Sequence, residues 1–224
     1  SAADIPCYAA KDGGRNRGQV YDPASASARH REMRGMSRLS SARDEGRLDL
    51  VFQPIVRIAG PADARPHYEL LLRLLDENGQ TVLPDEFIPA AERYNLMPSL
   101  DRWVIEKVLR DIVPSTRDGV EQATFTVAVN LSGTTLSDPG FLEFLIQALE
   151  THEPTPGVLC FEVTETAAIT NLGHASYLMR EMASRGCLIA LDDFGSGLSS
   201  FTYLRSLPVH FLKIDGHFVQ NVAT

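Results

Sequence analysis

Residues 188–197 read Leu-Ile-Ala-Leu-Asp-Asp-Phe-Gly-Ser-Gly, an apolar run that ends in two adjacent carboxylates and a glycine-rich stretch. A run of four apolar residues is typical of a strand that is buried on both faces. The neighbouring carboxylates of Asp192 and Asp193 repel each other unless a cation lies beside them. The glycines at 195 and 197 allow the backbone to approach a ligand closely. This stretch therefore predicts a buried strand that ends in a charged site.

The same pattern recurs along the chain, as short apolar runs that alternate with helical segments. The runs expected to be strands lie at 50–56, 68–74, 124–131, 158–163, 187–191 and 209–214. The segments expected to be helices lie at 39–45, 85–95, 99–112, 141–151, 174–185 and 198–206. Strands that alternate with helices favour a parallel α/β architecture.

Polar side chains stand at or near the ends of five of these runs. They are Glu69, Arg73, Asn130, Glu162, Asp192, Asp193, Lys213 and Asp215. In a (β/α) barrel the C-terminal strand ends form the active face, and charges there are costly to bury unless they are paired or bind metal. Carboxylate and amide oxygens suit Mg²⁺ or Mn²⁺, whereas the six histidines form no zinc motif. The set therefore indicates a metal site at one edge of the sheet.

Taken singly, several of these residues also have a purely structural interpretation. Glu69 could be a charge on an edge strand, and Asn130 could cap a short helix. Glu165 could lie in the first turn of a helix, where the helix dipole favours a carboxylate. Lys213 could simply pair with Asp215. It is the number of strands ending in such residues that favours a functional site.

Composition narrows the class of protein further. The chain has 224 residues, 44% of them hydrophobic, and 21 basic against 29 acidic residues give a net charge of −8. Phosphate affinity rests on Lys and Arg, so direct binding to DNA or RNA duplexes is not expected. Cys160 and Cys187 lie in apolar runs and, with Cys7, lack metal-ligand spacing, which favours buried thiols and a reducing compartment. A cytoplasmic location is expected, with any membrane contact made through other segments of a longer parent protein.

With these residues in place, positions 38–224 resemble the EAL family of cyclic-di-GMP phosphodiesterases. The motifs that carry the resemblance occur in order: Phe52-Gln53-Pro54-Ile55-Val56, Glu69-Leu70-Leu71-Leu72-Arg73, Val129-Asn130-Leu131-Ser132, Phe161-Glu162-Val163-Thr164-Glu165-Thr166, Leu191-Asp192-Asp193-Phe194-Gly195-Ser196-Gly197 and Leu212-Lys213-Ile214-Asp215. Leu70 replaces the signature Ala, and Leu198 replaces a usual aromatic residue. The resemblance implies an α/β fold, the TIM-like (β/α)8 barrel of the EAL type, incomplete here with about six strands. Two further strands and another catalytic glutamate are expected beyond Thr224.

The family resemblance also implies a reaction, the hydrolysis of cyclic-di-GMP to linear pGpG with two Mg²⁺ or Mn²⁺ ions. The implied metal ligands are Glu69, Asn130, Glu162, Asp192 and Asp193. The implied catalytic residues are Asp192, Lys213 near the attacking water, and Glu165 as a support for the Asp193–Gly197 loop. Implied substrate contacts are Gln53, Arg73 and Asp215. A homodimer coupled to this loop is expected.

The first residues resemble a different family. Residues 1–21, with Ala3-Asp4, Tyr8, Ala10-Lys11 and Gly14-Arg15-Asn16-Arg17, are similar to the C-terminal tail of a GGDEF domain, and residues 22–37 are expected to form a linker. Two alternatives to an enzyme remain: a catalytically impaired receptor that binds cyclic-di-GMP, and a regulatory interaction domain without a nucleotide. The full set of metal ligands favours the enzyme, and Arg73 and Gln53 argue against the last alternative.

Overall fold

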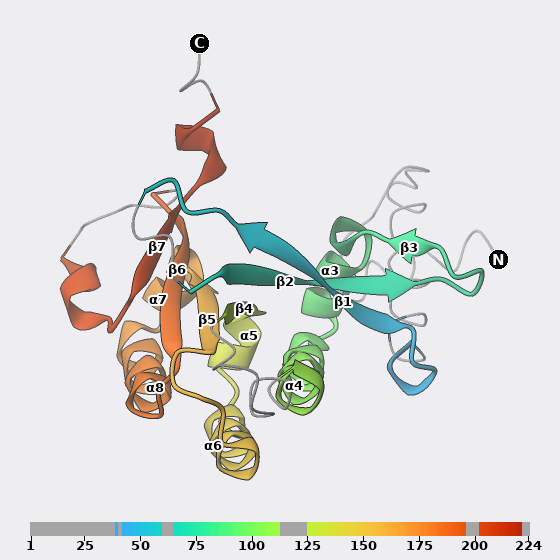
Figure 1. The fold of residues 1–224 in the computed structure, drawn as a ribbon, viewed down its shortest axis with the longest axis horizontal. Helices are drawn as coiled ribbons and strands as arrows, with labels where there is room; N and C mark the ends of the chain where they lie inside the picture. The colour runs from blue at the N-terminus through green and yellow to red at the C-terminus, as the bar shows by residue number, and fades with distance from the viewer. Residues whose placement is uncertain (1–38, 40–41, 60–64, 113–124, 196–201, 221–224) are drawn as a thin grey trace, which may run out of the picture. The chain divides into compact units, whose positions relative to one another are not determined.

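The computed structural model describes residues 39, 42–59, 65–112, 125–195 and 202–220 (Figure 1). The expected GGDEF tail and linker lie outside these residues, as do Cys7, Leu198 and the Ser196–Gly197 part of the glycine-rich loop. The chain divides into two compact units, Ser1–Leu48 with Leu74–Tyr94 and Asp49–Arg73 with Asn95–Thr224.

The first unit contains a short hairpin and one helix. Strand β3 (Thr81–Val82) pairs antiparallel with the end of β2, so that Leu74 lies opposite Val82. Helix α3 (Pro84–Arg93) begins with a proline, whose fixed φ suits the first helical turn. It buries Phe87, Ala90 and Ala91. The expected helix at 39–45 is helical at residues 39 and 42–44, with residues 40 and 41 not described.

The second unit contains most of a sheet with the strand order β1-β2-β4-β5-β6-β7. These strands are Leu48–Ile55, His67–Leu75, Thr126–Leu131, Leu159–Thr164, Leu188–Phe194 and Phe211–Ile214. All six expected strands are therefore confirmed. The neighbours from β2 to β7 pair in parallel, as predicted. The prediction of a parallel sheet was wrong for β3, which is antiparallel, and for β1, which runs opposite to β2 in Figure 1.

The helices of the second unit lie on the outer side of this sheet. They are α4 (Met97–Lys107) with the π-helical turn η1 (Val108–Ile112), α5 (Gly133–Leu136), α6 (Phe141–His152), α7 (Glu165–Thr170), α8 (Leu172–Ser184), η3 (Tyr203–Ser206) and η4 (Gly216–Phe218). In Figure 1, α4, α6 and α8 form an arc around β4, β5 and β6. The short helices α5 and α7 were not expected; Ser132 and Thr164 cap them with their hydroxyl groups. The described part of the expected helix at 198–206 is a 3₁₀ turn.

The two faces of the central strands differ because side chains alternate along a strand. The outward residues are large and apolar, each at most 1% exposed: Val127, Val129, Phe161, Val163, Ile189 and Leu191. The inward residues one step before the charged positions are small, and Ala128, Cys160 and Ala190 form a separate buried cluster. Cys160 and Cys187 are buried free thiols, as predicted. Among the described helices, none has the length and apolar character needed to cross a membrane.

The sheet curls strongly toward its inner face. Strands β2 and β7 are separated by β4, β5 and β6, so in a flat sheet they would lie roughly 19 Å apart at about 4.8 Å per step. Yet Nζ of Lys213 on β7 lies 3.1 Å from Oε2 of Glu69 on β2, and the rings of His67 and Phe211 are 5.3 Å apart. Side chains bridge these gaps only if the sheet is rolled up, as in part of a barrel.

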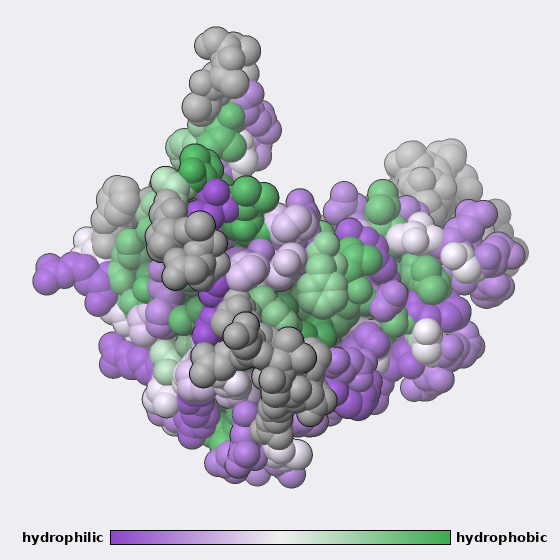
Figure 2. Space-filling model, viewed as in Figure 1, coloured by the Kyte–Doolittle hydropathy of each residue, from purple (hydrophilic) through white to green (hydrophobic). Residues whose placement is uncertain are grey.

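The first and last strands of the sheet order expose large apolar side chains. On β1, Phe52 is 50% exposed, and on β7 and the following turn Ile214 and Phe218 are 53% and 61% exposed. Figure 2 shows hydrophobic residues over the region where β7 and η4 lie. Exposed edges of this kind are normally paired or covered in a closed barrel, so the described strands have the surfaces of an open sheet.

Candidate active site

The strand register brings the charged residues to one level of the inner face. Asn130 on β4 lies directly opposite Glu162 on β5, and Glu162 lies opposite Ala190 on β6. Asp192 follows Ala190 by two residues, so it points to the same face one step further along. Paired residues of neighbouring parallel strands share a face, which places Asn130, Glu162 and Asp192 side by side. The sheet pattern alone thus builds the site.

Lys213 on β7 lies at the centre of a carboxylate cluster that consists of Glu69, Glu162 and Asp192. Its Nζ donates to Oε2 of Glu162 at 2.5 Å, to Oδ2 of Asp192 at 3.0 Å and to Oε2 of Glu69 at 3.1 Å. The possibility that Lys213 simply pairs with Asp215 is therefore wrong. One ammonium from the last strand connects the acidic groups of three others.

The charges of this cluster do not balance, since three carboxylates surround one ammonium. Glu162 is only 1% exposed, and burial raises the pKa of its carboxyl to about 7, against the opposing effect of Lys213. Burial alone would lower the pKa of Lys213, but the hydrogen bonds and charges of Glu162 and Asp192 raise it above its usual range. A further cation would relieve this excess of negative charge, and the oxygen donors suit a hard divalent ion.

Asn130 extends the cluster toward β4. Its Nδ2 donates to Oε1 of Glu69 at 3.1 Å. The possibility that Asn130 caps a helix is wrong, since Ser132 is the cap of α5. Among the described residues, no group of three or more His, Cys, Asp or Glu side chains has the arrangement of a formed metal site. The oxygens are gathered around an amine, so metal binding requires Lys213 to give up some of these contacts.

Asp192 and Asp193 both lie inside β6, although the sequence was expected to place them after a strand that ends at 191. Asp193 has a left-handed φ of 53° and an exposed side chain, and its backbone N–H donates to Oδ1 of Asp192. Burial, Asp192 and Asp215 together raise the pKa of the Asp193 carboxyl. Gly195 follows at φ +97°, where an added Cβ would come within 2.8 Å of the Phe218 ring, so glycine is required there.

Glu165 connects two segments that follow β5 and β6. It begins α7, as one structural interpretation predicted, and is fully buried. Its Oε2 accepts a hydrogen bond from the backbone N–H of Gly195 at 2.8 Å, and its Oε1 accepts one from the hydroxyl of Tyr203 on η3. The sequence gave no signal for Tyr203, because its partner lies 38 residues earlier and the contact depends on how α7 and η3 pack.

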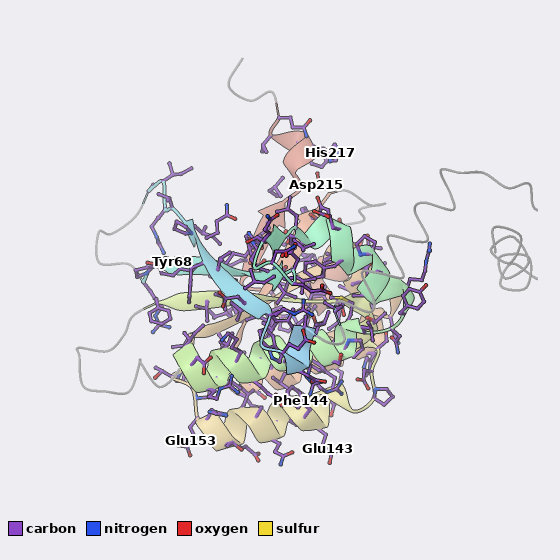
Figure 3. The ribbon with its side chains drawn as sticks, turned by 90° about the vertical axis from the view of Figure 1, so that its right-hand side faces the viewer. Tyr68, Glu143, Phe144, Glu153, Asp215 and His217 are labelled. Atoms are coloured by element: carbon purple, nitrogen blue, oxygen red, sulfur yellow. The ribbon has the colours of Figure 1, made fainter. Side chains whose placement is uncertain are left out.

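The expected substrate contacts lie apart from the carboxylate cluster. Gln53 is exposed on β1, and Arg73 shares the face of Glu69 on β2 but donates to the backbone oxygen of Leu72. Asp215 caps η4, and Figure 3 shows it together with His217 beyond β7. The Asp215 carboxylate accepts from the backbone N–H of His217 and contacts its Nδ1, which lowers the pKa of this carboxyl.

His67 is a second inner-face residue that the motifs did not single out. It precedes Glu69 by two residues, so both side chains lie on the same face of β2. Its Nε2 is buried and has no hydrogen-bond partner among the described residues. Burial and the nearby Lys213 lower the pKa of this histidine, which Glu69 partly opposes. The neutral ring packs edge-on against Phe211 beneath the charged level.

Comparisons with known proteins agree with this geometry. Residues 36–224 match the model of the EAL domain family. The chain is 37% identical over 223 residues to cyclic di-GMP phosphodiesterase PdeB of Shewanella oneidensis, covering 99% of the chain and 26% of that protein. It is 34% identical over 189 residues to cyclic di-GMP phosphodiesterase PdeF of Escherichia coli, covering 84% of the chain and 24% of that protein. The chain thus spans about a quarter of the length of these curated relatives.

Solved structures show the same fold. The structure of the FimX EAL domain from Pseudomonas aeruginosa bound to c-di-GMP superimposes with a TM-score of 0.75 at 35% identity, over 85% of this chain and 74% of that one. Together with the curled sheet, this establishes the TIM-like barrel of the EAL type, incomplete in the strands described. By family match, sequence identity and fold, the chain belongs to the EAL domain family.

Proposed function

We propose that the chain forms the catalytic centre of a phosphodiesterase that hydrolyses cyclic-di-GMP to linear pGpG with two divalent cations. The observation that carries the proposal is the convergence of Glu69, Glu162 and Asp192 on Lys213, which leaves an excess of negative charge on the inner face. The names of the relatives PdeB and PdeF support the same reaction.

The proposed metal ligands follow from the oxygens of the cluster. Glu69, Asn130, Glu162 and Asp192 hold the first Mg²⁺ or Mn²⁺ ion, and Asp192 shares the second with Asp193. When bound, two such ions acidify a water molecule and neutralise charge on the phosphoryl group. The exposed side chain and left-handed backbone of Asp193 leave its carboxylate free to turn toward the ion beside Asp192.

Lys213 has two roles in this proposal. Without metal, its ammonium holds the three carboxylates together and limits their mutual repulsion. With metal and substrate, the side chain shifts toward the attacking water and the phosphate, and its partial exposure of 27% leaves room for that shift. Glu165 acts through the backbone of Gly195 and so keeps Asp193 in its conformation.

The remaining functional assignments are also proposals. Gln53, Arg73 and Asp215 bind the dinucleotide once it lies over the inner face. The protein acts in the cytoplasm as a homodimer in which the segment after Asp193 couples the site to the subunit contact. A GGDEF tail at residues 1–21 and a linker at 22–37 precede the EAL domain at 38–224.

Chromatographic measurement of pGpG formation tests the proposed reaction. We expect the chain extended by the two expected βα units to convert cyclic-di-GMP to pGpG in the presence of Mg²⁺, and the 224-residue chain to do so weakly or not at all. Asp192→Asn should abolish the conversion, whereas Asp49→Asn, an exposed carboxylate on β1, should not. Binding of cyclic-di-GMP without pGpG formation by the extended chain would favour the receptor and contradict the enzyme.

A further inference from the structure

A buried carboxylate outside the cluster contacts the turn that follows β4. Asp101 lies on α4, is 5% exposed, and reaches the segment that begins two residues after Asn130. Its Oδ2 accepts a hydrogen bond from the backbone N–H of Ser132 at 2.9 Å and another from the hydroxyl of Thr135 at 2.6 Å. A buried carboxylate is costly unless it is hydrogen-bonded, so this position is under strong constraint.

The hydroxyl groups of the turn form a chain that ends on this carboxylate. The Ser132 hydroxyl donates to Oγ1 of Thr135 at 2.8 Å, and the backbone N–H of Thr135 returns a bond to Oγ of Ser132 at 3.1 Å. Thr135 is fully buried. No described Lys or Arg forms an ion pair with Asp101, because the adjacent Arg102 pairs with Asp138 at 2.7 Å. The carboxylate is therefore held by the turn itself.

This turn carries one end of the proposed metal site. Leu131, which is 4% exposed, fixes the strand end on the outer face, and Asp101 fixes the next peptide through the N–H of Ser132. Asn130 lies between these anchors and the inner face, where its amide contacts Glu69. A shift of the turn would move the Asn130 backbone, and with it the amide oxygen available to an ion.

We propose that Asp101 is a positioning residue that orients Asn130 by holding the β4–α5 turn. The proposal rests on the proposed function, in that Asn130 is taken as a metal ligand. Groups that orient a metal ligand from behind typically change metal affinity by 10–100-fold when they are removed. Asp101 therefore acts on the site from an outer helix, without contact to metal or substrate.

The test compares Asp101 with a buried hydrogen bond at the opposite end of the same strand. Thr126, 4% exposed at the start of β4, donates to the backbone oxygen of Gly157 at 2.7 Å. The variants are Asp101→Ala, Asp101→Asn and, as the matched control, Thr126→Val. Each is measured for Mn²⁺ affinity by calorimetry with the metal alone, for unfolding in urea, and for amide hydrogen exchange at Ser132 and Thr135.

We expect Asp101→Ala to weaken Mn²⁺ binding by at least about 10-fold and to speed exchange at Ser132. Asp101→Asn keeps an oxygen acceptor and should recover most of both losses, and it serves as the test if the alanine variant does not fold. Thr126→Val should lose stability but keep its Mn²⁺ affinity. Equal weakening in Thr126→Val, or unchanged affinity and exchange in both Asp101 variants, would overturn the inference. Wild-type protein that binds no Mn²⁺ would instead refute the metal site, while the exchange rates would still report whether Asp101 holds the turn.

Discussion

The two faces of the same strands obey different constraints. On β5, Phe161 points outward into the helices and is fully buried, whereas the next residue, Glu162, points inward and is buried to 1% among other charges. The outer face is filled by large apolar side chains that stabilise the fold through contact area. The inner face keeps small residues such as Ala128 and Ala190 beneath its charged level, and these leave room for the long side chains of Glu162 and Lys213.

The contrast shows that a single strand can separate stability from function by its alternation alone. Loss of an outward residue should reduce the free energy of unfolding without specific effect on the site. Loss of an inward residue should change the charge balance and ligand binding more than the packing. The predictions below test this separation, from the largest expected effect to the smallest.

The largest effect is expected from a change on the outer face. Phe161→Ala leaves a cavity among β5 and the helices, and such truncations lower the free energy of unfolding by about 3–5 kcal/mol. Urea unfolding measures the loss. Cys160→Ala on the inner face of the same strand removes only one sulfur atom and should cost clearly less. A larger loss for Cys160→Ala would mean that the inner face also acts as a packing core.

A smaller effect is expected from the ammonium at the centre of the cluster. Lys213→Met leaves three carboxylates without their counter-charge in the metal-free protein. Breaking a fully buried ion pair costs about 3–5 kcal/mol. Lys213 is 27% exposed, so solvent screening reduces the expected loss to about 1–3 kcal/mol.

Added Mg²⁺ distinguishes this charge effect from general damage. The ion should raise the unfolding midpoint of Lys213→Met more than that of the wild type, because the carboxylates are then available to it. Lys107→Met removes a surface lysine that pairs with Asp111 and should change neither quantity by more than about 0.5 kcal/mol. If Mg²⁺ stabilised the wild type and Lys213→Met equally, Lys213 and the ion would not share the same oxygens.

The smallest effect is expected where η3 meets α7. Tyr203→Phe keeps the ring but leaves the buried carboxylate of Glu165 with one donor fewer, which should cost about 1–3 kcal/mol at most. The change should also speed amide exchange at Gly195, whose N–H binds the other oxygen of Glu165. Tyr177→Phe on α8, where the ring is 54% exposed, is the control and should alter neither. Unchanged exchange at Gly195 would show that Tyr203 and Gly195 are held independently.

Much of the fold and the cluster could be predicted because both follow from local pattern. The apolar runs gave all six main strands, and period-two alternation correctly placed Leu70 on the face opposite to Glu69. The sequence also indicated that the charged residues would meet at one level. It placed Glu69 at a strand end, however, whereas the structure places it third in a strand that continues into the hairpin with β3.

What could not be predicted depends on how distant segments pack. The contacts of Asp101 with Ser132 and of Tyr203 with Glu165 join residues 31 and 38 positions apart, and neither pair belongs to a strand pattern. The antiparallel β3 was missed because two residues are too short to show alternation. The position of Lys213 among three carboxylates likewise required the curvature of the sheet, which sequence periodicity does not specify.

The central claim is that the inner face binds a divalent ion through the carboxylate cluster. Calorimetric titration with Mg²⁺ in the presence of cyclic-di-GMP, comparing the wild type with Asp192→Ala and with Asp49→Ala as the surface control, tests it most directly. We predict saturable binding by the wild type and Asp49→Ala, and no signal from Asp192→Ala. Absence of binding by the wild type, or equal binding by Asp192→Ala, would contradict the account.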